Sequence, residues 1–337
     1  MLHHTGILVG RRLGLALLGG AAALCILASG GLAATIITVD PPGSSATQVL
    51  AIDDAGTVTG WYFDGQVVHG FVRTRDGTIT AFDPPGSGYT TGDDINQKGA
   101  VSGMWYDGSM NHGFLRTRRG KYQTFDPAGS MQTDARSVNG EGMIGGFYYD
   151  HNSILHGFVR APDGTLTAFD PDGGTGTSVE SINAAGTVVG SYHIGGAYYG
   201  FTRSADGTIT SFQMAGEATF AYGINDSGTA TGSYIDSSDG HPHGYVRAKD
   251  GSFVSFDPAS SSSTRAQAIN ARGTIAGYYG DDRGGPHGFV RAANGKITSF
   301  DGPGAVNTFV NGINKHGAVV GWYVDSNNVS HGYLRMP

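Results

Sequence analysis

A unit of 43 or 44 residues recurs seven times along this chain of 337 residues, and the repeat limits the possible folds more than any other feature. One copy runs from Ile52 to Gly86 and reads IDDAGTVTGWYFDGQVVHGFVRTRDGTITAFDPPG. The glycine of its HGF triplet recurs at Gly70, Gly113, Gly157, Gly200, Gly244, Gly288 and Gly332. A fixed period of this size is typical of folds in which each copy is one supersecondary unit stacked on its neighbours.

Each unit predicts four short strands joined by turns. Glycine is abundant, with 57 residues, while Glu and Lys are scarce and Thr, Val, Tyr and Phe alternate, which favours strands over helices. The first strand ends in Ile-Asn followed by Gly, as in Ile182-Asn183 and Gly186, a pattern typical of a turn. The pair Asp76-Gly77 predicts a two-residue type I′ turn between the third and fourth strands. That turn would pair Phe71 with Phe82.

Seven units of four antiparallel strands predict an all-β fold, a seven-bladed β-propeller. The two chain ends fit a closed ring, because residues 35–40 match the fourth strand that the last unit lacks. We therefore expect this N-terminal strand to complete the last blade, with Tyr333 opposite Val39, and so to remove the open edges. An open solenoid is the alternative.

Residues 1–34 are predicted to be a secretory signal peptide, and residues 35–337 the propeller. Arg11 and Arg12 precede an apolar run that ends in small residues around Ala33 and Ala34. The predicted location is secreted or periplasmic, with no membrane span after cleavage; an uncleaved anchor is the alternative. Cys25 lies in the signal, so the mature chain has no cysteine and no disulfide framework.

The charge pattern argues against nucleic acid as a partner. Beyond the signal the chain has 19 basic and 28 acidic residues, and we find no basic run or stripe in the sequence. Familiar nucleophile, phosphate-loop and zinc motifs are absent from the sequence, so we name no catalytic residue, metal ligand or cofactor. We expect a monomer.

The pattern I-N-x-x-G-x-V-x-G followed by H-G-F resembles the HAF repeats of bacterial extracellular proteins. Ile182-Asn183, Gly186 and Gly190 carry the first part, and His156-Gly157-Phe158 carries the second, with Gly in place of the Ala in the family name. The resemblance covers the whole mature chain. It implies secretion and a repeated β architecture, and it implies no catalytic residues because the family is largely uncharacterised.

A histidine recurs before the Gly-Phe pair, and an aspartate recurs after the Phe of the fourth strand. The histidines are His69, His112, His156, His243, His287 and His331. They belong to different blades, so we expect them to brace blade corners through the aspartates rather than to converge on one metal ion. The fourth unit supports this pairing, since Tyr199 and Gln213 replace both residues together.

The residues that vary between units are the better candidates for a ligand site. They occupy two rows, three and five positions before the Asn slot of each unit, in the strand expected to line the central channel. The ten predicted ligand-binding residues are Asp93, Asp134, Arg136, Glu180, Phe220, Tyr222, Arg265, Gln267, Phe309 and Asn311. Drift among solvent-exposed positions is the alternative explanation of this variation.

The sequence favours a binding module that recognises a carbohydrate, peptide or partner protein on one propeller face. A hydrolase or lyase acting on polysaccharide is the second hypothesis, with Asp93, Asp134, Arg136 and Glu180 as the first residues to test. A structural surface protein without a discrete ligand is the third. The sequence alone leaves open whether the protein is an enzyme.

Overall fold

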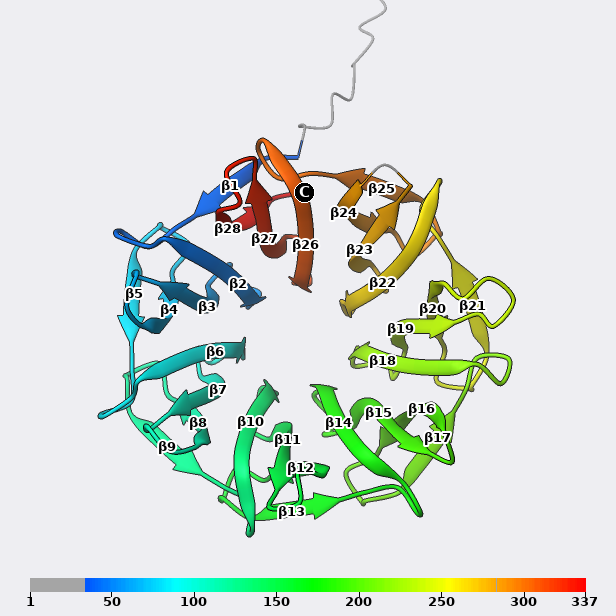
Figure 1. Ribbon diagram of the computed structural model, residues 1–337, viewed down its shortest axis with the longest axis horizontal. Helices are drawn as coiled ribbons and strands as arrows, with labels where there is room; N and C mark the ends of the chain where they lie inside the picture. Colours follow the sequence, from blue (N-terminus) through cyan, green and yellow to red (C-terminus); the bar gives the residue numbers. More distant parts are fainter. Residues whose placement is uncertain (1–33, 283) are drawn as a thin grey trace, which may run out of the picture. The chain divides into compact units, whose positions relative to one another are not determined.

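The computed structural model describes residues 34–282 and 284–337, so the predicted signal segment lies outside the described residues apart from Ala34. Residues Ala34–Pro337 form one compact unit. Its strands make seven four-stranded antiparallel blades. The blades are arranged in a ring around a central axis (Figure 1), which confirms the predicted propeller. Within the described ranges, no helix is long and apolar enough to cross a membrane.

The blades follow one another in sequence, and the first strand of each lies innermost (Figure 1). The innermost strands are β2 (Ala46–Ile52), β6 (Tyr89–Ile95), β10 (Ser130–Val138), β14 (Thr175–Ile182), β18 (Ala218–Ile224), β22 (Ser261–Ile269) and β26 (Ala305–Ile313). The second strands are β3 (Val58–Phe63), β7 (Val101–Tyr106), β11 (Ile144–Asp150), β15 (Val188–Ile194), β19 (Ala230–Ile235), β23 (Ile275–Asp281) and β27 (Val319–Asp325). The third strands are β4 (Val68–Arg73), β8 (Asn111–Arg116), β12 (Leu155–Arg160), β16 (Ala197–Arg203), β20 (Pro242–Arg247), β24 (Gly284–Arg291) and β28 (Ser330–Arg335). The outermost strands are β5 (Ile79–Phe82), β9 (Tyr122–Phe125), β13 (Leu166–Phe169), β17 (Ile209–Phe212), β21 (Phe253–Phe256), β25 (Ile297–Phe300) and β1 (Ile36–Val39).

The N-terminal strand closes the ring as predicted. Strand β1 pairs with β28 and supplies the outermost strand of the seventh blade. The backbone N–H of Met336 donates to the carbonyl of Thr35 at 2.8 Å, so the two ends of the blade lie together. Closure leaves each blade with a neighbour on both sides, which removes the free edges that an open array would have.

The predicted register of the outer hairpins is wrong by one residue. Phe82 lies opposite Gly70 rather than Phe71, and Tyr333 lies opposite Thr38 rather than Val39. The cause is the turn, in which the N–H of Gly77 donates to Thr74 and only Gly77 has a positive φ, of 95°. This is a type I turn followed by a glycine bulge, whereas a type I′ turn needs positive φ at both central residues.

The register explains the glycine of the HGF triplet. A Cβ on Gly70 would run into the ring of Phe82, and the corresponding glycines of the next five blades face the rings of their own outer strands in the same way. The phenylalanine after the glycine points to the other side of the sheet and is fully buried, as Phe71 and Phe114 show. The small residue therefore makes room for the aromatic ring opposite.

A belt of asparagine side chains links the blades near the channel. Each Asn that ends an innermost strand donates its amide to the carbonyl of the equivalent residue in the next blade, over 2.9 to 3.2 Å. Its side-chain oxygen accepts the N–H groups of its own turn, as Asn183 does from Thr187. The belt has six such links and one gap, because Asp53 occupies the slot in blade 1 and has no amide to donate.

Arginine side chains link the blades farther out. The arginine that ends each third strand lies over the Phe of the preceding blade, with 4.5 to 4.8 Å from its central carbon to the ring centroid. The six pairs are Arg116–Phe82, Arg160–Phe125, Arg203–Phe169, Arg247–Phe212, Arg291–Phe256 and Arg335–Phe300. Arg73 has no such ring, since Val39 fills the slot in blade 7. A cation over an aromatic face contributes about 0.5–2 kcal/mol.

The recurrent histidines brace the blade corners, as predicted. In six blades Nδ1 of the histidine lies 2.6 to 2.8 Å from the aspartate that follows the outermost strand. Nε2 lies 3.1 to 3.7 Å from a second aspartate, which ends the second strand or lies in the loop that follows it. In blade 4, which lacks both residues, Tyr199 stacks on Tyr192 and Gln213 donates to the carbonyl of Tyr198.

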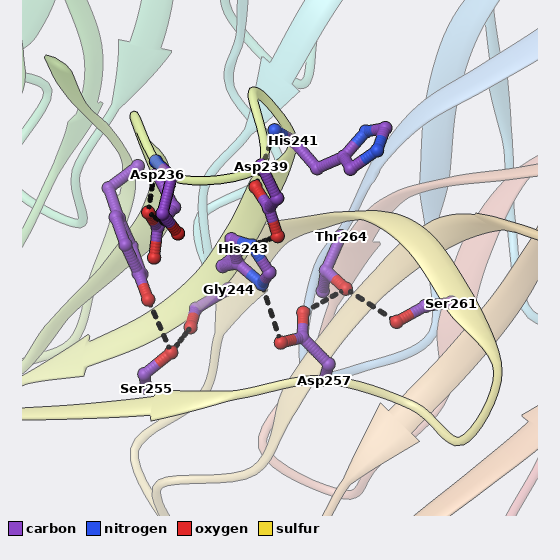
Figure 2. A network of polar contacts seen from close by, with 11 residues as sticks. Asp236, Asp239, His241, His243, Gly244, Ser255, Asp257, Ser261 and Thr264 are labelled. Atoms are coloured by element: carbon purple, nitrogen blue, oxygen red, sulfur yellow. Dashed lines mark hydrogen bonds and ion pairs between the residues drawn. The ribbon is translucent and has the colours of Figure 1, made fainter. Parts of the chain in front are cut away.

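Figure 2 shows this brace in blade 5. His243 lies between Asp239 and Asp257, and Asp257 also accepts from Thr264. The ring of His241 points away from His243, so the two imidazoles do not face a common point. Within the described ranges, no three His, Cys, Asp or Glu side chains are grouped to hold a metal ion.

A bulge in each innermost strand sets the direction of the side chains that reach the channel. In blade 4, Val179 pairs with Gly190 and Ser181 pairs with Val189, so Glu180 has no partner of its own. All seven innermost strands have a register shift at this place. A bulge bends the strand and turns the unpaired residue out of the alternating pattern.

A glycine in each second strand makes the bulge possible. A Cβ on Gly190 would overlap the carbonyl oxygen of Ser178, and the same overlap recurs in the other six blades. The seven glycines are Gly60, Gly103, Gly146, Gly190, Gly232, Gly277 and Gly321. This close backbone approach accounts for the last Gly of the I-N-x-x-G-x-V-x-G pattern.

Replacing Gly190 with Ala should therefore destabilise the protein by about 3 kcal/mol or more, because the new methyl group meets backbone that cannot move freely. Gly140 has no atom near its missing Cβ and no positive φ, so Gly140→Ala is the matched control and should change stability little. Urea unfolding of both variants checks the claim. Equal midpoints for the two variants would show that the close approach does not limit this position.

The belt can be tested by separating its two roles in one residue. Asn183→Asp keeps the turn acceptor but loses the donor to blade 5, while Asn183→Ala loses both, so we expect losses of about 1 and about 2 kcal/mol. Asp53→Asn supplies the missing donor and should stabilise by about 0.5–1.5 kcal/mol. Thermal and urea unfolding measure all three. An Asn183→Asp variant as stable as the wild type would refute the inter-blade role.

The histidine braces predict a pH dependence of stability. Partial burial opposes the imidazolium of His112, but hydrogen bonds to Asp126 and Asp107 outweigh burial and raise the pKa of His112. A raised folded-state pKa gives stability that is complete below the unfolded value of about 6.5 and is lost as pH rises through the folded value. We expect His112→Asn to cost about 1 kcal/mol more at pH 5.5 than at pH 8.5.

Melting curves at the two pH values measure this difference. Tyr199→Phe in blade 4 is the control, because no histidine occupies that corner, and its shift should be the same at both pH values. A His112→Asn penalty that is equal at both pH values, or larger at pH 8.5, would contradict the brace.

Candidate functional site

The seven bulged residues surround one point in the channel. They line a cavity of about 140 Å³, and we call them the channel ring: Leu50, Asp93, Arg136, Glu180, Tyr222, Gln267 and Asn311. A second cavity, of about 210 Å³, extends from the ring toward the C-terminal ends of the innermost strands, past the isoleucines at which these strands end. Every blade contributes one ring residue, and no two of the seven are alike.

The structure brings together six of the ten predicted site residues and leaves four outside the ring cavity. The six are Asp93, Arg136, Glu180, Tyr222, Gln267 and Asn311. The other four are Asp134, Phe220, Arg265 and Phe309, from the row five positions before the Asn slot. The bulge explains the difference, since it breaks the alternation that would have put both rows on one side.

The four excluded residues pack against neighbours in several ways. Phe309 stacks on Trp322 with ring centroids 4.1 Å apart, and Phe220 lies 5.0 Å from Tyr198. Arg265 is exposed and reaches the Tyr222 hydroxyl at 3.5 Å. Asp134 is buried, and its carboxylate forms an ion pair with Arg136, which is a residue of the channel ring.

Blades 2 to 4 give the ring a charged half. Arg136 lies between two carboxylates, with Nη1 3.6 Å from Asp134 and Nε 3.3 Å from Glu180. Ser178 donates to the other oxygen of Glu180. This cluster combines three carboxyl groups with one guanidinium, so it favours ligand groups that are cationic or that donate hydrogen bonds.

Asp93 and Asp134 form a coupled carboxyl pair. Burial and then the charge of Asp134 raise the pKa of Asp93 well above its ordinary value. Burial also raises the pKa of Asp134, although Arg136 opposes the shift. Oδ2 of Asp93 and Oδ1 of Asp134 are both buried, and neither atom has a hydrogen-bond partner among the described residues.

Blades 5 to 7 give the ring an uncharged, hydrogen-bonding half. Burial raises the pKa of Tyr222, whose hydroxyl lies 3.1 Å from Ser233. Asn311 donates to the carbonyl of Val49 at 2.8 Å, so this side chain also links blade 7 to blade 1. The Gln267 side-chain oxygen is buried and has no hydrogen-bond partner among the described residues. Gln267 is therefore a free acceptor facing the cavity.

Asp94 is a channel residue that the sequence reasoning missed. It lies below the ring and accepts from the N–H of Val138 at 2.8 Å and from the Ser137 hydroxyl at 3.0 Å. Burial raises the pKa of Asp94 to about 6 despite these bonds. The sequence contains a pattern that could have identified Asp94, because the equivalent position in the other six units holds only small residues: Ala51, Ser137, Ser181, Gly223, Ala268 and Gly312.

The two faces of the ring differ in their connections. We call the face with the second-to-third and fourth-to-first connections the loop face, and the face with the short turns the turn face. Aspartates dominate the connections of the loop face, where the brace residues lie, and these connections hold no arginine or lysine among the described residues. The turn face carries the third-strand arginines and most of the lysines.

Comparison with known proteins gives a fold and no family. No family model matches the chain, and no curated protein matches it. Among solved structures, oligogalacturonate lyase from Vibrio parahaemolyticus matches with a TM-score of 0.63 and 10% identity, covering 89% of this chain and 93% of that one.

Two further solved structures match this chain with similar TM-scores and sequence identities. Virginiamycin B lyase from Staphylococcus aureus has a TM-score of 0.55 and 13% identity, covering 90% of this chain and 99% of that one. The β-propeller domain of the Trilobed protease from Pyrococcus furiosus has a TM-score of 0.61 and 8% identity, covering 87% and 94%. At these identities the likeness establishes the propeller fold alone.

Proposed function

We propose that the protein is a secreted or periplasmic binding module whose channel ring recognises a carbohydrate, a peptide or part of a partner protein. One observation carries the proposal: the position that varies most between repeats is the position whose seven copies line one cavity. A repeated frame with a diversified, convergent set of polar side chains is the usual form of a recognition site.

We propose that the ligand reaches the ring along the channel, which continues from the ring cavity into a cavity of about 310 Å³ lined by the asparagines that follow the innermost strands. Cationic groups or hydroxyl donors of the ligand would meet Asp93 and Glu180, while its acceptors would meet the Tyr222 hydroxyl. The ring cavity is small, so it would hold one sugar unit, one side chain or one chain end of a larger ligand.

A polysaccharide lyase or hydrolase is the second candidate, and the Asp93–Asp134 pair is the observation that favours it. Two neighbouring buried carboxyl groups whose pKa values are both raised are candidates for a general acid and a general base. Turnover of a polysaccharide panel by the wild type, lost in Asp134→Asn, would support this candidate. Binding without turnover would favour the module.

Binding can be separated from stability with a matched pair of glutamine variants. Gln267→Ala removes a buried acceptor that has no partner in the fold, so we expect ligand affinity to fall about tenfold while the melting temperature stays within 2 °C. Gln66→Ala makes the same change at an exposed position in a loop of blade 1 and should affect neither. A glycan and peptide array identifies the ligand, and calorimetry measures its affinity for all three proteins.

Replacing Asp93 of the carboxyl pair gives a second test, in which the variant is expected to be more stable than the wild type. Because the pKa of Asp93 is raised in the folded state, its ionised form opposes folding at neutral pH. Asp93→Asn should therefore raise the melting temperature at pH 7.5, with the gain vanishing near pH 4, and should weaken ligand binding about tenfold or more. A variant that binds normally, or that melts earlier at pH 7.5, would contradict the assignment.

A further inference from the structure

The seven-fold repeat provides its own controls, and one turn on the turn face departs from all the others. The turn between the third and fourth strands of blade 2 reads Thr117-Arg118-Arg119-Gly120-Lys121. Its side chains carry three positive charges. The same turn reads TRDGT, APDGT, SADGT, AKDGS and AANGK in blades 1, 3, 4, 5 and 6, where the charges sum to between −1 and +1.

Arg119 replaces a residue that stabilises the turn elsewhere. The equivalent Asp76 accepts from the Thr78 N–H at 3.0 Å and from the Thr74 hydroxyl at 2.6 Å. The other equivalents are Asp163, Asp206, Asp250 and Asn294, each of which accepts an N–H of its own turn. Arg119 cannot accept a hydrogen bond, so in blade 2 the N–H of Lys121 donates instead to the hydroxyl of Thr117 at 3.1 Å. Departures of this kind from a local rule are expected where function requires them.

The positive charges of this turn are not neutralised by the protein. Arg118, Arg119 and Lys121 are exposed, as is Arg75 in the turn of blade 1. None of the four has a carboxylate within 4 Å among residues 34–282 and 284–337. Lys98 is the nearby exception, with an exposed contact of 3.5 Å to Glu141.

A cavity of about 280 Å³ lies beside these charges, between blades 1 and 2. Arg116 and Arg118 line it, together with hydroxyl and amide side chains and with apolar ones. The polar side chains are Thr57, Thr74, Thr80 and Gln97, and the apolar ones are Ala55, Val72 and Ile95. Asp53 also lines the cavity, so it lies at the interface where the asparagine belt has its gap. We call this cavity with Arg119 and Lys121 the blade 1–2 groove.

We propose that the blade 1–2 groove binds a carboxylated or sulfated sugar unit of an acidic polysaccharide. The arginines supply paired donors to the acidic group, and the threonine and glutamine side chains match sugar hydroxyls. No aromatic side chain lines the groove, so it offers no platform for stacking nucleic-acid bases. The site is on the turn face and does not depend on the function proposed for the channel ring.

The test converts the turn of blade 2 to the residues of the other blades. The variant R118A/R119D/K121T uses only side chains found at these positions elsewhere in the chain, so it should melt at or above the wild-type temperature. Affinity for heparin and for polygalacturonate, measured by calorimetry at 50 mM salt, should fall at least tenfold, and the dependence of affinity on salt should become shallower.

Three controls fix the interpretation. Lys249→Ala removes one exposed charge from the turn of blade 5 and should leave affinity unchanged. Neutral dextran should not bind, and the stronger of the two acidic probes shows whether sulfate or carboxylate is preferred. Equal binding by the wild type and the turn variant, no binding of either probe, or tighter binding of single-stranded DNA would each overturn the proposal.

Discussion

The close approach between each innermost strand and the glycine of its neighbouring strand is the contact on which the channel depends. The carbonyl of Ser178 occupies the space of a Cβ at Gly190, and this arrangement recurs in all seven blades. It allows a bulge, and the bulge turns one residue per blade toward the axis. Because the requirement falls on backbone and glycine, the bulged side chain itself is free to vary. A uniform frame can therefore hold seven different residues around one cavity.

The forces that hold the blades together lie away from that cavity. The asparagine belt, the arginine–phenylalanine pairs and the histidine braces use the same residue types in nearly every blade. The ring differs, since Asp93 at a ring position lies beside the buried Asp134. Burial disfavours the ionised form of each carboxyl group and so raises the pKa of both. A cost at a variable position, beside well-satisfied repeated positions, is characteristic of a functional site.

Much of the fold could be predicted from the sequence because the same pattern of strands and turns occurs in seven copies that can be compared with one another. The blade count, the closing strand and the histidine–aspartate corners follow from residues that recur or change together, as Tyr199 and Gln213 do. The ring row was predicted as well, but strict alternation wrongly joined Phe220 and Phe309 to it, since a bulge leaves no signal in side-chain polarity. The outer register was missed because type I and type I′ turns both accept Asp-Gly. The basic residues of blade 2 stand together in the sequence, within residues 116–121, but their position beside a cavity lined by side chains of blade 1 follows only from the fold.

A crystal structure of the mature protein with the best ligand from the glycan and peptide arrays tests the central claim most directly. The account predicts ligand density inside the channel ring, with a ligand group within hydrogen-bonding distance of Gln267 and of a carboxylate in blades 2 to 4. An empty ring in a crystal whose ligand is bound to the outer blade surfaces would contradict it. The variation among the seven ring residues would then be drift at positions that carry no recognition.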